Sequence, residues 1–577
     1  MKIGEFKKNN RFNTRIPESE IFIQSEKDDR VKSYLIPKKI IWKSESENVK
    51  IINDKALLEK RSGQITLDTV NPCILHNQGG EAGVLLDFGI ELQGGIEILV
   101  WKCGANNKNA KLRIRFGESV MEAMSEIGGQ GNATNNCAVR DMVVEVSCHG
   151  MTEIGNTGFR FVRIDLLDED AYIEIKSVRA AFVYRDIEYK GSFRCNDDLL
   201  NAIWNTGAYT VHLNMQNYLW DGIKRDRLVW IGDMHPETST IQAVFGYDYV
   251  VPKSLDFVRE ETKLPGWMNG IPTYSMWWIL IHHSWYMHNG DILYLTEQKE
   301  YLLALLNQLV EYIDENGRSA TPEWRFVDWP STKNQQAVDA GIHAIMVLAM
   351  DAGAKLLSVL KDQKNSEKCS QAVEKLRQYK HDHNGNKQAA ALMVLAGIAD
   401  AAIINKEVLS VEGAKNLSAF MGFYVLKARA LAGDIIGSLD SIREYWGGML
   451  KLGATTFWED FNIEWMENSA RIDEIVTGNK KDVHGSYGDY CYKGYRHSLC
   501  HGWSSGPTPW LTENILGIKI LAPGCKVIRI APNLGDLQWV EGTYPTPLGI
   551  IYIRHERQDD GHIKSSIDVP EGIEVLR

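Results

Sequence analysis

The chain has 577 residues, of which 44% are apolar and 24% are charged, which indicates a folded globular protein of several domains. Its formal net charge of −11 argues against a nucleic-acid partner, because phosphate binding needs a basic face. No run approaches 18 consecutive apolar residues, so we expect no membrane partner.

The N-terminal stretch MKIGEFKKNNRFNTRIPESE bears on the compartment. It lacks the apolar core of a signal peptide, which predicts a cytoplasmic protein, with a trimmed periplasmic or secreted form as the alternative. The nine cysteines are scattered and form no CxxC pair, so reduced and mostly buried thiols are expected rather than a disulfide framework.

Residues 1–190 have the pattern of β-strands. Segments such as GVLLDFGIELQGGIEILVW, AKLRIRFGESV and AYIEIKSVRAAFVY alternate or are rich in β-branched residues, and Gly and Asn turns separate them. Regular strands of this kind predict an N-terminal β-sandwich domain over 1–190.

The pattern becomes helical near residue 191. Asn196 is a candidate N-cap, with Asp197 and Asp198 in the first turn, and apolar residues then recur near helical spacing. From here to residue 520, helical segments alternate with loops rich in Trp, Gly and Pro. A helical toroid over 191–520 would bury so many amphipathic faces, although the sequence shows no repeat of fixed period.

After NILGIKILAPGCK the alternating pattern returns. VIRIAPN, DLQWVEGTYPTPLGIIYIRHER and HIKSSIDVP have the composition of strands separated by Pro and Gly turns. We therefore expect a small C-terminal β domain over 521–577.

The stretch WDGIKRDRLVWIGDMHPE, residues 220–237, gathers carboxylates, cations and indoles in a loop between two helices. Asp221, Asp226 and Asp233 are five and seven residues apart, and two arginines flank the middle one. Cations lower a carboxyl pKa, whereas burial beside an indole such as Trp230 raises it, as a general acid near neutral pH requires. Both a sugar-binding cleft and a salt-bridged structural loop fit this composition.

Two other stretches carry weaker signals. GATTFWEDFNIEWMEN places Glu459 beside an indole, where it could activate water, although a structural role also fits. RHSLCHGWSSGPTPWL carries His497 and His501 but no Cys/His set at metal-ligand spacing, so no metal site is expected there. The chain has no GxSxG, P-loop or Rossmann glycine pattern.

Together the three stretches resemble the bacterial α-L-rhamnosidases, glycoside hydrolase family 78. ATTFWED is similar to the family's T-T-x-W-E segment, SLCHGWSSGPTPWLTENILGI to its late toroid segment, and FGESVMEA and YPTPLGIIYI to its two β domains. The resemblance covers nearly the whole chain from about residue 80. The family's catalytic loop reads roughly D-x-x-x-R-[D/E]-R-x-x-W-x-G-D, which matches Asp221, Arg225, Asp226, Arg227, Trp230, Gly232 and Asp233.

The resemblance implies an N-terminal β-sandwich, an (α/α)6 toroid and a C-terminal β-sandwich domain. It also implies an inverting, exo-acting glycoside hydrolase that removes a terminal α-L-rhamnose without a metal or organic cofactor. In an inverting glycosidase one carboxylic acid protonates the leaving oxygen and a second carboxylate activates water. By position, the implied general acid is Asp226 and the implied base is Glu459. The implied substrate-binding residues are Asp221, Arg225, Trp230, Asp233, Asp328, Trp329 and His501.

The chain departs from the family at the acid, which is usually Glu. Aspartate is one methylene shorter, so the Asp226 carboxyl would lie roughly 1–1.5 Å further back on an unchanged backbone. A misplacement of that size can cost about 10²-fold in rate. The loop could lie further inward, the substrate could lie deeper, or another group, with Glu237 the nearest, could be the acid.

Two alternatives to a rhamnosidase stay open. A carbohydrate-binding relative could keep the toroid and have weak catalysis, and the aspartate at the acid position motivates this hypothesis. A hydrolase or lyase acting on uronates could use a similar toroid, and the cations Lys224, Arg225 and Arg227 would suit such substrates.

Overall fold

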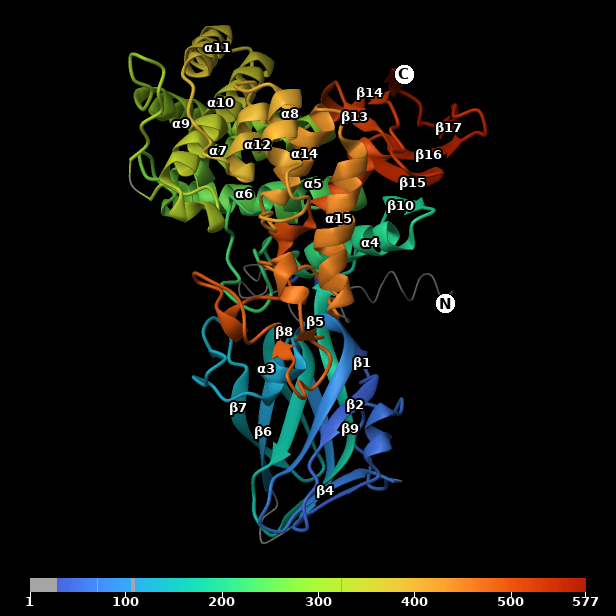
Figure 1. Ribbon diagram of the computed structural model, residues 1–577. Helices are drawn as coiled ribbons and strands as arrows, with labels where there is room; N and C mark the ends of the chain where they lie inside the picture. Colours follow the sequence, from blue (N-terminus) through green and yellow to red (C-terminus); the bar gives the residue numbers. More distant parts are fainter. Residues whose placement is uncertain (1–27, 70, 105–108, 323, 577) are drawn as a thin grey trace, which may run out of the picture.

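The computed structural model describes residues 28–69, 71–104, 109–322 and 324–576. The N-terminal stretch that we examined for a signal peptide lies outside these residues. A β-sandwich, a helical toroid and a second β domain follow one another along the chain (Figure 1). This is the predicted fold class and order.

The N-terminal domain is built on one nine-stranded antiparallel sheet that folds over its own core. Its central order is β3-β4-β9-β5-β8-β6-β7, with β1 paired to β9 and β2 to β5. The strands are β1 (Arg30–Leu35), β2 (Lys39–Lys43), β3 (Val49–Ile52), β4 (Cys73–Asn77), β5 (Ala82–Gly104), β6 (Asn109–Gly117), β7 (Asp141–Ser147), β8 (Gly150–Leu166) and β9 (Ala171–Arg185).

The long strand β5 bends between its partners. Its register against β8 shifts between Asp87 and Leu92 and again between Gly94 and Ile96. Gly94 has φ 140°, and a Cβ there would lie 2.1 Å from the carbonyl oxygen of Ala181, so only glycine fits this crossing. A short helix, α3 (Val120–Met124), follows β6 and faces the helical domain.

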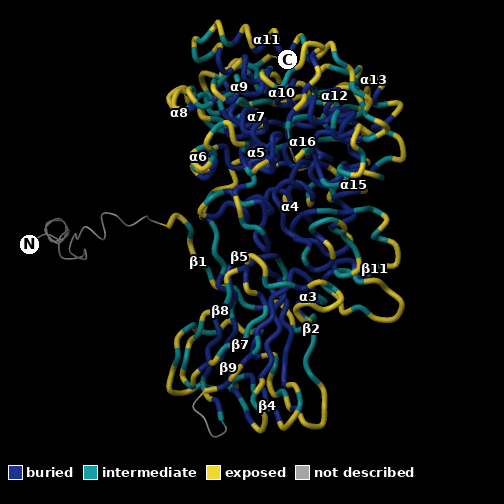
Figure 2. Tube along the Cα trace, turned by 90° about the vertical axis from the view of Figure 1, so that its left-hand side faces the viewer, coloured by how far each residue is buried: buried dark blue, intermediate teal, exposed yellow. Residues whose placement is uncertain are grey.

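The central domain consists of helices around a core that is rich in aromatic residues. Figure 2 shows buried chain throughout its interior and along the strip where it meets the β-sandwich near α3 and α4. The helices are α4 (Asp198–Asn214), α5 (Met234–Val244), α6 (Val250–Glu261), α7 (Pro272–Asn289), α8 (Ile292–Glu297), α9 (Lys299–Glu311), α10 (Gln335–Val359), α11 (Gln363–Gln378), α12 (Lys387–Leu395), α13 (Ala401–Ile404), α14 (Gly422–Leu431), α15 (Ile435–Lys451) and α16 (Pro507–Asn514).

The start of α4 differs by one residue from the sequence-based expectation. Its N-cap is Asp197, whose carboxylate accepts hydrogen bonds from the backbone N–H groups of Leu199 and Leu200. Asn196, the predicted cap, instead accepts from the backbone of Gln538 in the C-terminal domain. The prediction was wrong because Asn and Asp cap helices about equally well, and a tertiary contact decides between adjacent candidates.

Helix α10 is long and apolar enough to cross a membrane by length and composition. However, 72% of its most apolar window is buried inside the protein, as expected of the core helix of a globular domain.

The C-terminal β domain takes strands from both sides of the toroid. The four-stranded sheet β10-β15-β16-β17 and the three-stranded sheet β13-β14-β18 make up this domain. The strands β10 and β13 fall within the range 191–520 that we predicted as toroid. Their bounds are β10 (Ser192–Cys195), β13 (Ile518–Ile520), β14 (Val527–Ile530), β15 (Trp539–Thr546), β16 (Gly549–Arg557), β17 (Ile563–Asp568) and β18 (Glu574–Leu576). Two further short strands, β11 (Ser469–Ala470) and β12 (Lys481–Asp482), pair in a loop of the toroid.

Candidate active site

Backbone hydrogen bonds join the three stretches that the sequence analysis singled out. Gly222 and His501 form an antiparallel bridge, and the N–H of Gly502 donates to the Asp221 carbonyl at 2.9 Å. The N–H of Glu459 donates to the Ser498 carbonyl at 2.9 Å. Segments more than two hundred residues apart in the chain therefore lie side by side and form one surface, which we call the floor of the candidate site.

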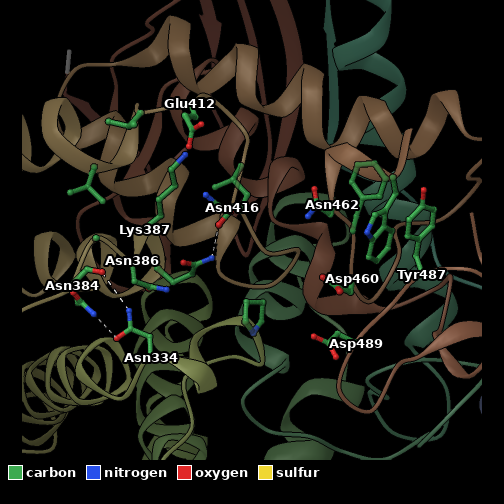
Figure 3. Close-up of a pocket in the computed structure, with 18 of the residues that line it drawn as sticks. Asn334, Asn384, Asn386, Lys387, Glu412, Asn416, Asp460, Asn462, Tyr487 and Asp489 are labelled. Carbon is green, nitrogen blue, oxygen red and sulfur yellow. Dashed lines mark hydrogen bonds between the residues drawn. The ribbon is translucent and has the colours of Figure 1, made fainter. Parts of the chain in front are cut away.

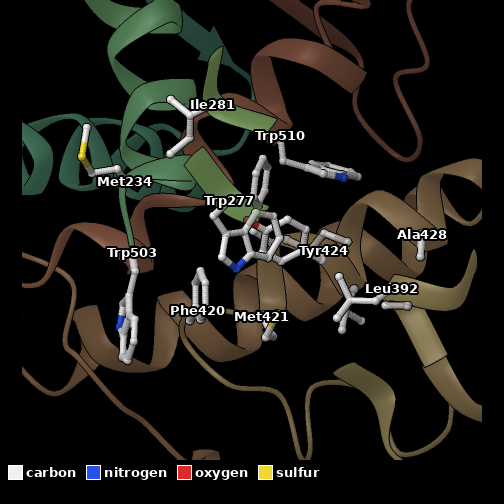
Figure 4. Packing of buried hydrophobic residues seen from close by; sticks show 14 of the residues in the cluster. Met234, Trp277, Ile281, Leu392, Phe420, Met421, Tyr424, Ala428, Trp503 and Trp510 are labelled. Carbon is white, nitrogen blue, oxygen red and sulfur yellow. The ribbon is translucent and has the colours of Figure 1, made fainter. Parts of the chain in front are cut away.

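Aromatic packing supports this floor from below. The indole N–H of Trp503 donates to the Glu459 carbonyl at 2.8 Å, and its ring lies 4.4 Å from that of His501. Trp503 also stacks on Phe420 with ring centroids 5.1 Å apart (Figure 4). The core thus holds both Glu459 and His501 in place.

The loop between α4 and α5 makes a tight reversal at the predicted acid. Asp226 and Arg227 have φ of 55° and 58°, a left-handed conformation that Asp tolerates better than most residues. The indole N–H of Trp230 donates to Asp226 Oδ2 at 3.2 Å. This turn directs the Asp226 carboxyl back toward the side chain of its neighbour Arg225.

The guanidinium of Arg225 links the two predicted catalytic carboxyls. One terminal nitrogen donates to Asp226 Oδ1 at 3.1 Å, and the other donates to Glu459 Oε1 in a very short contact. The two terminal nitrogens of a guanidinium lie about 2.3 Å apart, since both are bonded to one carbon. The two carboxylate oxygens are therefore at most about 8 Å apart, below the upper end of the roughly 6.5–9.5 Å found in inverting glycosidases.

The two carboxyls differ in exposure. The side chain of Asp226 is 25% exposed, whereas that of Glu459 is 4% exposed. Glu459 also accepts a hydrogen bond from the backbone N–H of Ser498 at 3.1 Å. Burial works to lower the pKa of Arg225, but the adjacent charges of Glu459 and Asp226 outweigh it and raise the pKa above its usual range.

Two buried acids and a histidine complete the floor. His501 Nε2 lies 3.7 Å from Asp221 Oδ2 and 3.9 Å from Asp233 Oδ2. Burial, with the nearby charge of Arg225, lowers the pKa of His501 to about 3, so the ring is neutral near pH 7. Burial and neighbouring carboxylates raise the pKa of Asp221 and of Asp233 well above the ordinary value.

This acid–acid–histidine set could also hold a cation. Its ligand atoms all lie within 4.8 Å of one another. A pyranose would use the same groups differently, since carboxyl and imidazole atoms accept from or donate to sugar hydroxyls. Two polar atoms at the site, His501 Nδ1 and Arg225 Nε, are buried without a hydrogen-bond partner within the described part of the chain.

The loop that carries the predicted aromatic contact lies beside the site. Trp329 is partly exposed and stacks on Tyr490 at 5.8 Å between ring centroids. Asp328 is buried, and its two carboxylate oxygens accept from the Ser331 N–H and the Ser418 hydroxyl. Asp328 thus fixes the loop that presents Trp329, and its predicted contact with a sugar stays a prediction.

Glu237, the alternative acid, lies beneath the floor. It is fully buried on α5, and a Cβ on Gly502 would come within 1.7 Å of its Oε1. Burial and the nearby Asp233 and Asp221 raise its pKa well above the ordinary value. Asp226, by contrast, is partly exposed, with 25% of its side chain accessible to solvent.

Sequence reasoning missed several groups that shape the site. Tyr274 donates its hydroxyl to Asp233 Oδ1 at 2.9 Å, and its ring meets Trp230 edge to face at 5.9 Å. Tyr490 lies against Trp329, as described above. Tyr274 lies in the stretch LPGWMNGIPTYSMWW, one of the segments rich in Trp, Gly and Pro that we expected to be loops, but its second half is the start of α7 (Pro272–Asn289). The aromatic composition of this stretch was the available signal for Tyr274, whereas nothing marked Tyr490.

Comparisons with known proteins agree with the predicted resemblance. A model of the bacterial alpha-L-rhamnosidase 6 hairpin glycosidase domain matches residues 188–394, and a model of the bacterial alpha-L-rhamnosidase C-terminal domain matches residues 517–576. The first match includes Asp226 and Trp329, whereas Glu459 and His501 lie between the two matched ranges.

Two curated alpha-L-rhamnosidases are similar to the chain. The protein from Alteromonas sp. (strain LOR) is 24% identical over 468 residues, which cover 72% of this chain and 47% of that protein. The protein from Formosa agariphila is 24% identical over 179 residues, which cover 30% of this chain and 18% of that protein. The matched part of this chain thus spans less than half the length of either relative.

Solved structures show the same fold. The GH78 family rhamnosidase of Bacillus sp. GL1 has a TM-score of 0.73 at 24% identity, covering 90% of this chain and 55% of that one. A rhamnosidase from Klebsiella oxytoca with rhamnose bound has a TM-score of 0.63 at 17% identity, covering 84% of this chain and 96% of that one. The predicted fold class and the predicted resemblance are confirmed.

Proposed function

We propose that this relative of the bacterial α-L-rhamnosidases is an exo-acting, inverting glycoside hydrolase that releases a terminal α-L-rhamnose or a similar sugar. The observation that carries the proposal is the convergence of Asp226 and Glu459 on the guanidinium of Arg225. A carboxyl pair at this separation, above a floor of buried sugar-binding groups, suits general acid and base catalysis of glycoside cleavage.

The difference in exposure supports one assignment of the two roles. The leaving group of an exo-acting enzyme departs toward solvent, so its proton donor lies at the open side, as the partly exposed Asp226 does. The attacking water lies on the opposite sugar face, which is the deeper side where Glu459 is buried. Asp226 gives its proton to the glycosidic oxygen as the C–O bond breaks, and Glu459 takes a proton from the water that attacks C1.

The remaining groups bind and orient the sugar in this proposal. Asp221, Asp233 and the neutral His501 hold ring hydroxyls, while Trp230 and Trp329 pack on carbon faces. Arg225 donates a hydrogen bond to each of the two carboxyls and so fixes their relative positions. The substrate is a carbohydrate, and the floor groups need no metal or organic cofactor for these roles.

The uronate-acting alternative has less support than the sequence suggested. Lys224 is fully buried in ion pairs with Glu118 and Glu122. Arg227 donates to Asn156 and lies over a tryptophan ring. Only Arg225 of the three candidate cations faces the site, and two carboxylates already engage it.

Kinetics with two leaving groups test the proposal. We expect Glu459→Gln to lower kcat by orders of magnitude on every rhamnoside. Asp226→Asn should lower kcat by about 10²–10⁴-fold on an alkyl rhamnoside but far less on a nitrophenyl rhamnoside, whose leaving group barely needs protonation. An Asp226→Asn enzyme that loses both activities equally contradicts the assignment of the acid.

Two further measurements separate the alternatives. NMR of the first sugar released shows whether the anomeric configuration is inverted or retained. We expect inversion; retention would contradict the proposed mechanism and would indicate the closer carboxyl pair, about 5–5.5 Å apart, of retaining enzymes. A panel of aryl glycosides identifies the sugar. Binding of free rhamnose without hydrolysis of the nitrophenyl rhamnoside would instead indicate the catalytically weak, carbohydrate-binding relative.

A further inference from the structure

A cavity of about 430 Å³ lies where the toroid meets the C-terminal domain, since toroid helices, the strand β13 and Tyr544 of β15 all line it. This volume is within the range of small-molecule sites, which often lie between helices and at domain boundaries. A larger cavity, of about 740 Å³, lies next to the catalytic floor, because Asp460 lines it and directly follows Glu459 (Figure 3). The smaller cavity is remote from that floor.

The smaller cavity lies at the opposite end of the toroid helices from the catalytic floor. Helix α5 begins directly after Asp233, and α7 carries Tyr274 in its first turn, both at the floor. In the last turns of the same two helices, Gln242 and Met287 line the cavity. The last turns of α12, α14 and α16 line it as well. From Asp233 to Gln242 the helix rises about 14 Å, so a ligand in the cavity would not occupy the catalytic floor.

Several polar groups of the lining have unused hydrogen-bonding capacity. Gln242 is only 7% exposed, and its amide nitrogen is buried without a hydrogen-bond partner in the described part of the chain. His235, two turns earlier on the same face of α5, contacts the Tyr424 hydroxyl through Nδ1 at 2.8 Å, and no described residue bonds to its Nε2. Burial, with the charge of Lys427, lowers the pKa of His235 to about 3, so the ring is neutral near pH 7 and can donate or accept. A buried amide without a partner is costly unless a ligand supplies one.

The charges around the cavity favour a neutral ligand. Lys427 pairs with Glu513 at 3.3 Å, and Lys519 is an exposed cation at the rim. Beside the cavity, Lys355 and Asp351 pair with each other at 2.7 Å. The lining side chains therefore carry one excess positive charge, whereas the carboxyl ends of five helices gather at the same place and contribute partial negative charge. The two effects offset each other, so neither an anion nor a cation is strongly preferred.

Apolar side chains make up much of the remaining lining. They come from α7, α12, α14 and β13, so they surround the cavity from several sides. A ligand with an apolar body would be removed from water against them, which is the main driving force for binding in cavities of this kind. These residues include Met287, Leu395, Ala430, Ile518 and Ile520.

We propose that this cavity is a binding site for a neutral, hydroxylated small molecule with an apolar body, such as a phenol. The apolar body packs between α5, α14 and β13, and the hydroxyl group bonds with the amide of Gln242 and the imidazole of His235. The inference does not depend on the proposed glycoside hydrolase function, because no residue of the candidate active site lines the cavity.

Fluorescence titration with 2-naphthol, a neutral two-ring phenol, tests the site. We expect saturable binding to the wild-type protein with a Kd below about 1 mM. Gln242→Leu keeps the size of the side chain but removes its amide, and should weaken binding about fivefold, as the loss of one hydrogen bond predicts. Ala430→Phe, which fills the cavity from α14, should abolish binding. The matched control is Gln371→Leu, at an exposed position of α11, which should bind as the wild type does.

Urea unfolding of the same variants separates a ligand-binding role of Gln242 from a structural one. Because its amide nitrogen has no partner among the described residues, Gln242→Leu should unfold at the same urea concentration as the wild type or at a higher one. Weaker binding together with a clear loss of stability would contradict the proposal. No saturable binding to the wild type, or the same Kd in both cavity variants as in the wild type, would overturn it. Tighter binding of the anion 2-naphthoate than of 2-naphthol would overturn the neutral ligand class.

Discussion

Replacing Asp226 by the longer glutamate, the residue usual in the family, should lower activity in this chain. The aspartate carboxyl already reaches both of its partners, Arg225 at 3.1 Å and the Trp230 indole at 3.2 Å. An added methylene moves the carboxyl forward by roughly 1–1.5 Å into space that these contacts define. Asp226→Glu therefore tests whether the loop is shaped for the shorter acid.

The magnitude follows from geometry and backbone conformation. Displacement by about 1 Å from a productive position costs about 10²-fold in rate, or about 2.7 kcal/mol of transition-state stabilisation. The left-handed backbone at Asp226 (φ 55°) adds a cost to stability of about 1 kcal/mol, because Glu lacks the short side chain that eases this conformation. We expect kcat/KM to fall about 10²-fold, with only a small loss of stability.

The assay compares wild type and Asp226→Glu on an alkyl rhamnoside, with unfolding followed by urea titration. Asp440→Glu, at an exposed position of α15, is the control for the added methylene itself. Activity of Asp226→Glu equal to or above that of wild type would refute the reasoning. The loop would then position either carboxyl equally well, and the aspartate would not indicate a loop shaped for the shorter side chain.

Three further outcomes are expected. Lys224→Met should lower the free energy of unfolding by about 3–5 kcal/mol, measured by urea titration against the exposed control Lys480→Met, because it leaves Glu118 and Glu122 buried without their cation. Burial raises the pKa of Glu118 to about 7, so the folded state binds more protons than the unfolded state above pH 4.5. Stability should therefore fall by up to about 3 kcal/mol between pH 4.5 and 7, and Glu118→Gln should flatten that part of the pH profile of the melting temperature. Dialysis against EDTA should leave kcat unchanged if the buried acid–acid–histidine set holds sugar hydroxyls, whereas a loss restored by a divalent cation would assign that set to a metal.

Local signals in the sequence were sufficient for the fold class and for a set of residues that the structure brings close together. Asp221, Asp226 and Asp233 stand in one short loop with Trp230, and the family motif places Glu459 and His501 with them. The structure brings these residues together through backbone contacts between their segments. These residues could be recognised from the sequence because each motif is one continuous stretch of the chain.

Contacts between distant segments were not visible in the same way. Strand β10 pairs with β15, about 350 residues later, and its residues Ser192–Cys195 give no indication of that partner. The partners of Lys224, two glutamates on and before α3, are likewise set by the docking of the β-sandwich on the toroid. Residue type predicts that a buried lysine needs a carboxylate, but only the fold selects which one.

The same lysine suggests why the β-sandwich accompanies the toroid. The loop of Lys224, Arg225 and Asp226 contacts the β-sandwich on one side, where Arg140 donates to the Lys224 carbonyl and Gly158 donates to that of Ile223. On its other side the loop bridges to His501. A left-handed turn under no such restraint would relax toward ordinary backbone angles and withdraw the acid. The β-sandwich therefore supports one side of the loop that carries the proposed acid, and we expect its removal to abolish activity even where the toroid stays folded.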